Sequence, residues 1–581
     1  MSFIRSFGAA AAALSLLLAG VPALAQEAPQ IVGDWHGTLT TPRGPVVLVL
    51  YVTEGEDGAL EAKVENANQA PGQMADVTSI AVDGEHLSWK IDRIGASFEG
   101  DWQAENHAWK GTFNQGGALP LTFEAGLPPP MPVVEGLDGL WEGTAKLNNA
   151  NLRQVLRITT GERGTIMLID SPDQLANGVP VEDFRRNGRE VSFSLMGGVT
   201  KFTGTLSEDM TRLNGAYTNT LNDNVAEVSL TRMQGEAAAP KPPARPQTPQ
   251  EPFPYTAEEV AFDNPAFAEV HLAGTLTLPE GKGPFPAAVL ITGSGGQDRD
   301  ETLMGHRPFA VIADYLTRRG IAVLRYDDRG VAKSTGDYAA ATSADLATDA
   351  NAAAAYLMTR PEIRHDAVGF IGHSEGGMIG PIAASKNSDI AFVVMLAGPG
   401  THLDQLMLSQ QRLIGMTMGA SEAQVDKQEP VMAALFRAIA DADTPEAGKA
   451  AARAVLTPEA LAKLGVPANY DPDVIVGQIS GPWYQYFLKY DPAPVLASLE
   501  MPILAIGGSL DLQVPAEANL AAIKAATAAN SDATVTELPG LNHLFQHAKT
   551  GGIGEYAQIE ETFAPEALDL VGDWIAARFV N

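Results

Sequence analysis

The sequence contains no cysteine among its 581 residues. Disulfide cross-links, thiol nucleophiles and thiolate metal ligands are therefore excluded, and stability has to come from packed cores. Basic residues are also scarce, because 39 Lys and Arg stand against 70 Asp and Glu and give a formal charge of −31. Such an acidic surface repels polyanions, which excludes nucleic acid and anionic membrane surfaces as favoured partners.

Long apolar runs are absent after the first 25 residues, so we expect no membrane span in the mature chain. The N-terminal stretch has the parts of a secretory signal: Arg5, an apolar segment at 9–19, and Ala23-Leu24-Ala25 before an expected cleavage at Gln26. An uncleaved anchor is the alternative, but the apolar segment is shorter than the roughly 20 residues that a span needs. A lipoprotein is excluded because Val21 stands where a lipid-bearing cysteine is required. The sequence therefore predicts an exported protein, periplasmic or extracellular.

Residues 31–125 alternate apolar and polar side chains at period two, as half-buried strands do. The pattern then starts again, since the motif at 33–37 recurs 106 residues later at 139–143, each with Trp at its centre and Gly at both ends. Gly100 and Gly204 match at a spacing of 104, so a two-residue deletion separates the copies. We predict two all-β repeats, 26–128 and 129–234, that resemble lipocalin-like small barrels or meanders. Either they are a structural module that docks a partner or an envelope polymer, or they bind substrate, because fold alone does not establish a ligand.

Seven prolines between 235 and 255 indicate a semi-rigid spacer between domains. From 256 to 581, short β-rich runs alternate with Ala-rich helical stretches. Strands are predicted at 287–292, 322–326, 367–371, 391–396, 503–506 and 534–538, and helices at 307–319, 343–359 and 377–385. Buried strands separated by helices predict an α/β domain with a doubly wound, mostly parallel sheet. Sites in such sheets lie at the carboxyl ends of the strands.

A candidate nucleophile follows one of these strands. Gly372-His373-Ser374-Glu375-Gly376-Gly377 stands between a predicted strand and a predicted helix. A serine in such a sharp turn needs small residues two positions away on either side, and Gly372 and Gly376 meet that need. The motif alone is common, but in this position it predicts Ser374 as the nucleophile.

A serine hydroxyl needs a base to take its proton. His543 follows the last predicted strand and is the preferred base, with His547 as the nearest alternative. Asp511 follows the strand at 503–506 and is the preferred acid that orients the imidazole, with Asp491 as the alternative. Asp491 precedes Pro492, which is more typical of a helix start.

A carbonyl substrate also needs two donors for its developing oxyanion. The first is the backbone amide of Glu375, and the second comes from the glycine-rich loop 293–298, where we favour Ser294 over Gly295. A phosphate cradle is a weak reading of this loop because no Lys-Ser/Thr follows it. The chemistry needs no metal or organic cofactor.

Together these motifs resemble a bacterial α/β-hydrolase serine esterase with a Gly-His-Ser-Glu-Gly-Gly elbow. Asp327-Asp328-Arg329-Gly330 adds to the resemblance, and we expect a structural turn there. The resemblance covers just over half the chain and implies a carboxylesterase that takes short acyl chains. Acyl-CoA thioesterases and prolyl-oligopeptidase-type peptidases are relatives, but the peptidase elbow usually has Trp or Tyr where His373 stands.

About a hundred residues separate the strands at 391–396 and 503–506, so we expect a helical cap at about 401–495. Its candidate acyl-pocket residues are Met407, Met416, Met418 and the cluster Trp483-Tyr484-Gln485-Tyr486-Phe487, although most of these could simply pack the cap. The predicted function is a secreted serine carboxylesterase for small esters, acting through Ser374, Asp511 and His543. The alternatives are another serine acyl hydrolase (peptidase, amidase or thioesterase) and a non-catalytic binding protein.

Overall fold

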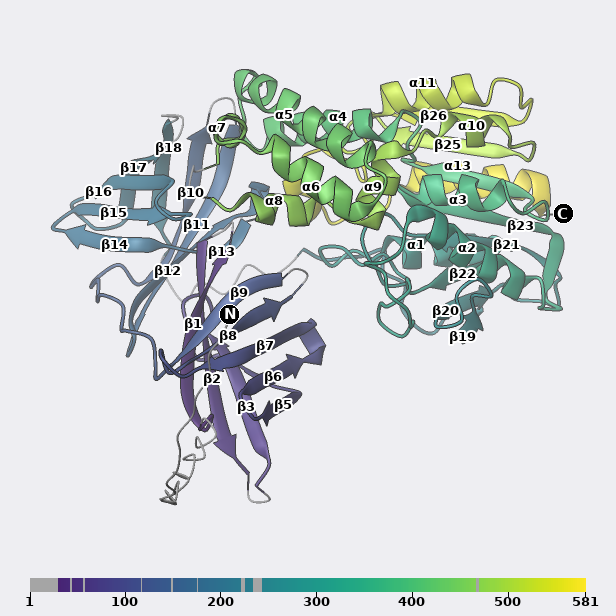
Figure 1. Ribbon diagram of the computed structural model, residues 1–581. Coiled ribbons are helices and arrows are strands. Elements are labelled where there is room, and N and C mark those ends of the chain that lie inside the picture. The colour runs from purple at the N-terminus through teal and green to yellow at the C-terminus, as the bar shows by residue number, and fades with distance from the viewer. Residues whose placement is uncertain are drawn as a thin grey trace, which may run out of the picture. The chain divides into compact units, whose positions relative to one another are not determined.

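The computed structural model of the protein describes residues 30–41, 44–55, 58–115, 118–147, 150–174, 176–220, 225–233, 243–466 and 470–580 (Figure 1). The expected signal segment, residues 1–25, lies outside the described residues. The described strands form three separate sheets. No α-helix in the described ranges is long and apolar enough to cross a membrane.

The first sheet contains nine strands in the order β4-β3-β2-β1-β9-β8-β7-β6-β5. Most of these strands bury alternate apolar side chains, and in their core Trp89 packs against Phe98 and Phe123 with ring centroids 6.1 and 6.4 Å apart. The period-two pattern therefore gives the expected half-buried strands. The strands are β1 (Gly33–Thr41), β2 (Gly44–Glu54), β3 (Leu60–Asn66), β4 (Met74–Asp76), β5 (Ser79–Asp83), β6 (His86–Ile91), β7 (Ala96–Gln103), β8 (Ala108–Asn114) and β9 (Ala118–Ala125).

The second sheet has nine strands in the equivalent order, β13-β12-β11-β10-β18-β17-β16-β15-β14. Gly100 lies opposite Gly111 in the first sheet, and their equivalents Gly204 and Gly215 lie opposite each other in the second. The sequence repeat is therefore also a repeat of strand register. The strands are β10 (Gly139–Leu147), β11 (Ala150–Gly161), β12 (Gly164–Ser171), β13 (Ala176–Pro180), β14 (Glu182–Asn187), β15 (Glu190–Leu195), β16 (Thr200–Leu206), β17 (Arg212–Asn219) and β18 (Val225–Arg232).

Both of these sheets curl back on themselves. In the first, the edge strands β4 and β5 are joined by Val77 and Thr78 alone. The Val77 amide donates to the Ala62 carbonyl of β3 (2.9 Å), whereas the Thr78 amide donates to the Lys90 carbonyl of β6 (2.7 Å). Adjacent residues thus bond to strands near opposite edges, so the two edges meet at this corner. In the second sheet Val181 alone joins β13 to β14. The N-terminal part is all-β and barrel-like, as predicted.

The third sheet has eight strands in the order β19-β20-β22-β21-β23-β24-β25-β26. Strands β21 to β26 are parallel, and β19 and β20 add an antiparallel edge. The predicted doubly wound, mostly parallel sheet is confirmed, with the two edge strands as additions. The strands are β19 (Thr256–Asp263), β20 (His271–Leu278), β21 (Phe285–Ile291), β22 (Ala322–Tyr326), β23 (Ile363–His373), β24 (Phe392–Leu396), β25 (Ile503–Gly508) and β26 (Ala533–Leu538).

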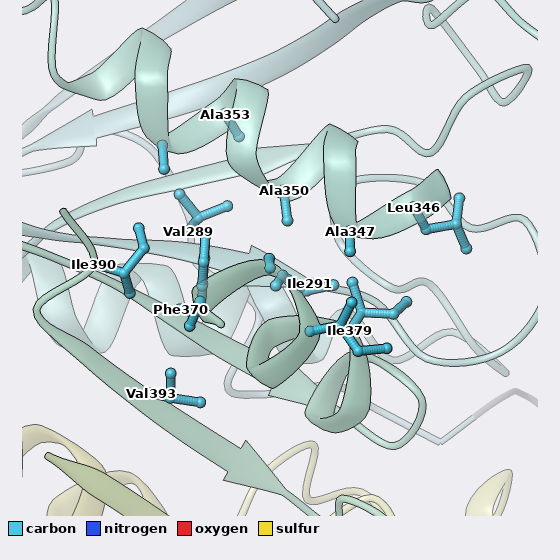
Figure 2. Packing of buried hydrophobic residues seen from close by; sticks show 14 of the residues in the cluster. Val289, Ile291, Leu346, Ala347, Ala350, Ala353, Phe370, Ile379, Ile390 and Val393 are labelled. Atoms are coloured by element: carbon cyan, nitrogen blue, oxygen red, sulfur yellow. The ribbon is translucent and has the colours of Figure 1, made fainter. Parts of the chain in front are cut away.

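Helices cover both faces of the third sheet. Helices α1 (Pro308–Arg318) and α13 (Pro565–Phe579) pack on one face, and α2 (Ser343–Leu357), α3 (Gly376–Ala384) and α11 (Ala516–Ala526) pack on the other. Figure 2 shows Ala347, Ala350 and Ala353 of α2 pointing toward Val289 of β21 and Phe370 of β23. These small side chains bring the helix close to the larger strand residues, as dense packing requires.

The segment between β24 and β25 forms the predicted helical cap, drawn in green in Figure 1. It has a small core of its own, which includes Leu435, Phe436, Leu461 and Leu488. The helices are α4 (Leu403–Thr417), α5 (Glu422–Ala440), α6 (Pro445–Val455), α7 (Pro458–Leu464), α8 (Pro472–Gln478), α9 (Pro482–Lys489) and α10 (Ala493–Ala497).

The predicted spacer at 235–255 is described only from residue 243 onward. Gln247 in this part donates its amide to the Phe563 carbonyl (2.7 Å) and accepts from the Thr562 and Phe563 amides (2.6 and 3.0 Å). Arg245 donates to the carbonyls of Met304 (3.0 Å), Ala557 (3.0 Å) and Ile559 (2.7 Å). This part of the chain therefore packs on the C-terminal domain and does not act as a free spacer.

Candidate active site

Ser374 stands in a sharp turn between β23 and α3. Its φ is +53°, in the left-handed region that residues with a Cβ rarely adopt. A Cβ at Gly372 would lie 1.9 Å from the Gly376 carbonyl oxygen, and a Cβ at Gly376 would lie 2.1 Å from the Ile291 carbonyl oxygen. The close backbone approach thus requires glycine at both positions. Ser374 lines a cavity of about 470 Å³ at the carboxyl edge of the sheet.

His543 and Asp511 come together at the same edge. Nδ1 of His543 lies 2.8 Å from Oδ2 of Asp511. The other carboxylate oxygen accepts the amides of Gln513 and Val514, both at 2.8 Å, which fixes its orientation. Because Oδ2 is an acceptor, Nδ1 carries the proton and Nε2 is left as a base. His543 lines the same cavity as Ser374.

The two alternative residues have other roles. Asp491 is exposed and accepts the Ala493 amide at the start of α10 (3.0 Å). His547 pairs with Glu561 and Glu566, each at 2.9 Å, and its hydrogen bond to Glu561 raises the pKa of its imidazole. Neither residue lines the cavity among the residues described.

The glycine-rich loop after β21 passes beside the elbow. A Cβ on Gly293 would lie 3.2 Å from the Cβ of Ser374, and Ser294 and Gly295 line the cavity. Within the described ranges, the amides of Ser294 and Glu375 donate to no protein acceptor. The Gly295 amide likewise donates to no protein acceptor among the described residues, so both predicted loop donors are available. The geometry thus leaves the Ser294 and Glu375 amides open to a ligand.

Asp328 holds this loop in place, and its neighbour Arg329 is attached to α2. Asp328 accepts the Thr292 hydroxyl and the Gln297 amide, both at 2.9 Å, and burial raises the pKa of its carboxyl well above the usual value. Arg329 pairs with Asp349 on α2 at 2.7 Å. The segment is a structural turn beside the site, as the sequence suggests.

The side chain of Glu375 links the elbow to the cap. Its Oε1 accepts the Ser343 hydroxyl of α2 (2.6 Å) and the Trp483 indole N–H of α9 (2.8 Å). Burial raises the pKa of the Glu375 carboxyl, although these donors and the Ser294 hydroxyl act in the opposite direction. Sequence reasoning assigned a role only to the Glu375 amide, because nothing in the local pattern reveals a contact with Trp483, 108 residues away.

A buried Glu301–His373 pair was also missed. Nδ1 of His373 lies 2.9 Å from Oε1 of Glu301, and Nε2 lies 3.0 Å from the His543 carbonyl oxygen. Oε1 of Glu301 also accepts the Gly293 amide (2.8 Å). His373 was visible as part of the elbow motif, but Glu301 lies in a loop without a recognisable signal.

The wall of the cavity formed by the cap is largely apolar. Trp483 and Phe487 of α9 stack there with ring centroids 4.6 Å apart, and Leu406 and Met407 of α4 lie beside them. Of the predicted acyl-pocket residues, Met407, Trp483 and Phe487 therefore line the cavity. The other predicted residues face elsewhere, because helical periodicity does not tell which side of the cap faces the sheet; they are Met416, Met418, Tyr484, Gln485 and Tyr486.

The strand–serine–helix turn on a doubly wound sheet is the arrangement of the α/β-hydrolase superfamily. Residues 306–548 match the family model described as "Serine aminopeptidase, S33". This match includes both the elbow and the candidate base His543, so the sequence comparison supports the same site. The C-terminal domain therefore has the α/β-hydrolase fold, and its residues 306–548 are similar to this family.

Among curated relatives, Esterase EstD of Thermotoga maritima is 30% identical over 243 residues, which cover 42% of this chain and 50% of EstD. Acyl-coenzyme A amino acid N-acyltransferase 2 of Rattus norvegicus is 29% identical over 140 residues, which cover 23% and 29% of the two chains. The chain thus spans half or less of the length of these relatives. Among solved structures, the α/β hydrolase GrgF of Penicillium sp. aligns with a TM-score of 0.36 at 18% identity, covering 56% of this chain and 100% of GrgF.

Proposed function

We propose that the protein is an exported carboxylesterase that hydrolyses small acyl esters through an acyl-enzyme on Ser374. The observation that carries the proposal is the convergence of Ser374 and the His543–Asp511 pair on one cavity with an apolar wall. That wall suits an acyl chain, and about 470 Å³ suits a small ligand. The similarity to EstD, an esterase, supports the same reaction class.

In the first step, Nε2 of His543 takes the proton of the Ser374 hydroxyl as Oγ attacks the ester carbonyl carbon. The carbonyl oxygen becomes an oxyanion, which the amides of Ser294 and Glu375 stabilise. Asp511 stabilises the imidazolium that forms. His543 then gives its proton to the leaving alcohol, and the acyl-enzyme remains.

In the second step, water replaces the alcohol. His543 takes a proton from the water, the hydroxide adds to the acyl carbon, and the same two amides hold the second oxyanion. Collapse of this intermediate breaks the bond to Oγ, which regains a proton from His543. The carboxylic acid leaves and the free enzyme returns.

An aminopeptidase is the second candidate, because the matching family model carries that description. Such an enzyme needs a free carboxylate for the substrate's ammonium group. Two carboxyls line the cavity: Oε1 of Glu301 contacts His373 and Gly293, and Oε1 of Glu375 accepts from Ser343 and Trp483. Oε2 of Glu375 is buried and has no hydrogen-bond partner among the described residues.

The nucleophile is tested with a fluorophosphonate probe. We expect the wild type to be labelled and Ser374→Ala to remain unlabelled, with His547→Gln as a control that labels normally. A panel of short esters, anilides and thioesters with the same acyl group then ranks the reaction types. Faster turnover of anilides or thioesters than of esters would contradict the carboxylesterase assignment.

Export is the second part of the proposal and rests on the sequence of residues 1–25. Fractionation of cells that express the full chain, followed by N-terminal sequencing of the mature protein, tests it. We expect Gln26 as the first residue in the exported fraction. An intact N-terminus in the cytosolic fraction would contradict the proposal.

A further inference from the structure

The Glu301–His373 pair is buried beside the elbow and takes no part in the two steps above. Glu301 is 4% exposed and His373 is 6% exposed. Glu301 has a φ of +53°, which is an uncommon backbone conformation for a residue with a Cβ. Such local strain is kept only where the surroundings hold it, and it gathers at functional sites.

The hydrogen-bond partners define the charge of His373. Nδ1 faces a carboxylate oxygen that already accepts the Gly293 amide, and Nε2 faces the His543 carbonyl oxygen. Both partners accept, so both ring nitrogens have to donate, and only an imidazolium can do so. Burial alone would lower the pKa of the His373 imidazole, but Glu301, the His543 carbonyl and Asp511 outweigh burial and raise it.

The contacts of this pair join three segments of the active site. Glu301 holds the Gly293 amide and with it the loop that carries Ser294. His373 directly precedes Ser374, and its Nε2 holds the backbone of His543, with the two imidazole rings 4.8 Å apart. We propose that Glu301 and His373 are positioning residues. Their charged pair fixes the oxyanion loop, the nucleophile and the base in position relative to one another. The inference rests on the acyl-transfer function proposed above.

Stability alone is a poor explanation for this pair. Removing two charges from water costs several kcal/mol per ion, and apolar replacements of buried ion pairs are often as stable or more so. Although its burial is costly, the pair connects two loops to the elbow and so preorganises the geometry of the active site. Its loss should therefore affect the rate of acyl transfer more than substrate binding.

The first test is the variant Glu301→Gln. The matched control is Glu561→Gln, because Glu561 also pairs with a histidine (His547, 2.9 Å) but lies on the surface. The amide removes the negative charge, so His373 holds its proton less tightly, and a neutral ring has only one N–H and can no longer donate both to residue 301 and to the His543 carbonyl. We expect kcat at pH 8–9 to fall about 10- to 100-fold, as for other residues that orient catalytic groups. KM should change by less than about twofold, because the acyl wall is untouched.

The pH profile separates positioning from general damage. In the wild type, both partners of His373 accept and favour the charged ring, so kcat should persist to higher pH than in the variant. In Glu301→Gln, the active form is the one with protonated His373, so kcat should fall again as pH rises. The groups facing His373 are Glu301, Asp511 and His543, and only the first is changed. A flat alkaline limb with wild-type kcat in this variant would overturn the proposal.

The second test does not depend on turnover. Nitrogen-15 NMR of histidine-labelled protein, with His373→Gln for assignment, reports the protonation of both ring nitrogens. We expect both nitrogens of His373 to carry protons at pH 7 in the wild type, and observation of a neutral ring there overturns the proposal even if Glu301→Gln fails to fold. Absence of fluorophosphonate labelling in the wild type would instead refute the proposed function. The NMR measurement would still report the protonation of His373 in that case.

Discussion

Nδ1 of His543 lies 2.8 Å from Oδ2 of Asp511, and the two side chains are buried, with exposures of 5% and 0%. Asp511→Asn keeps the shape of this contact but presents an amide that can hold the wrong imidazole tautomer. We expect kcat to fall by about 10⁴ with little change in KM, as in other triads. Ester turnover measures the effect, and Asp491→Asn is the control, because Asp491 serves only the start of α10. Equal losses in both variants would contradict the assignment of Asp511.

Trp483 forms part of the apolar wall and should set acyl-chain preference. Trp483→Ala removes contact with roughly two methylene groups of a hexanoyl chain, each worth about 0.8 kcal/mol. We expect kcat/KM for a hexanoyl ester to fall about tenfold more than for the acetyl ester of the same alcohol. Met416→Ala is the control, because Met416 lies on α4 but is 43% exposed and outside the cavity. An equal loss of kcat/KM for the acetyl and the hexanoyl ester would contradict the assignment of Trp483 to the apolar wall.

Glu375 should make stability depend on pH. Its pKa is raised above the ordinary 4.5, chiefly by burial, so the folded state binds the proton more tightly than the unfolded chain. Stability contributed by the neutral carboxyl is therefore complete below 4.5 and declines as pH rises toward the folded-state pKa. Glu375→Gln imitates the neutral form, and Gln can still accept from Ser343 and Trp483.

We therefore expect the Tm of Glu375→Gln, relative to wild type, to rise with pH above 4.5 and to level off at higher pH. Calorimetry at a series of pH values measures this difference. A falling difference would show that Glu375 is more stable in its charged form.

Gln247 should contribute to the stability of the C-terminal domain although it lies in the proline-rich segment. Gln247→Ala leaves the Thr562 and Phe563 amides and the Phe563 carbonyl without their partner. The cost should be about 1–3 kcal/mol, measured by urea unfolding. Gln250→Ala is the control, because the Gln250 amide reaches only the exposed Thr248 carbonyl (3.2 Å). Equal stability of the two variants would show that the Gln247 contacts are replaced by water.

The elbow could be predicted because its requirements are local. Gly372 and Gly376 are needed two residues on either side of Ser374, so the sequence shows the whole turn. His543 and Asp511 could be proposed because each follows a buried strand, and parallel strands end at one edge. Strands β19 and β20 were not predicted, since they form the antiparallel edge of the sheet and β19 carries charged residues along its length.

The remaining site residues are held by contacts between distant segments. Glu301 meets His373 across 72 residues, and Trp483 meets Glu375 across 108, and neither spacing follows from helical or strand periodicity. Gln247 meets Phe563 across 316 residues for the same reason, and proline content predicted only a semi-rigid spacer at this segment. Such contacts depend on how loops return to the sheet, which local patterns do not encode.

The corners where each β repeat turns back leave only short outer strands. Strands β4 and β5 contain three and five residues, and β13 and β14 contain five and six. Pairing between chains starts from long unpaired strands, so these repeats offer neighbouring copies little backbone on which to add a strand. The chain has no cysteine and therefore no disulfide bonds. The short outer strands protect it against aggregation at high concentration without such cross-links.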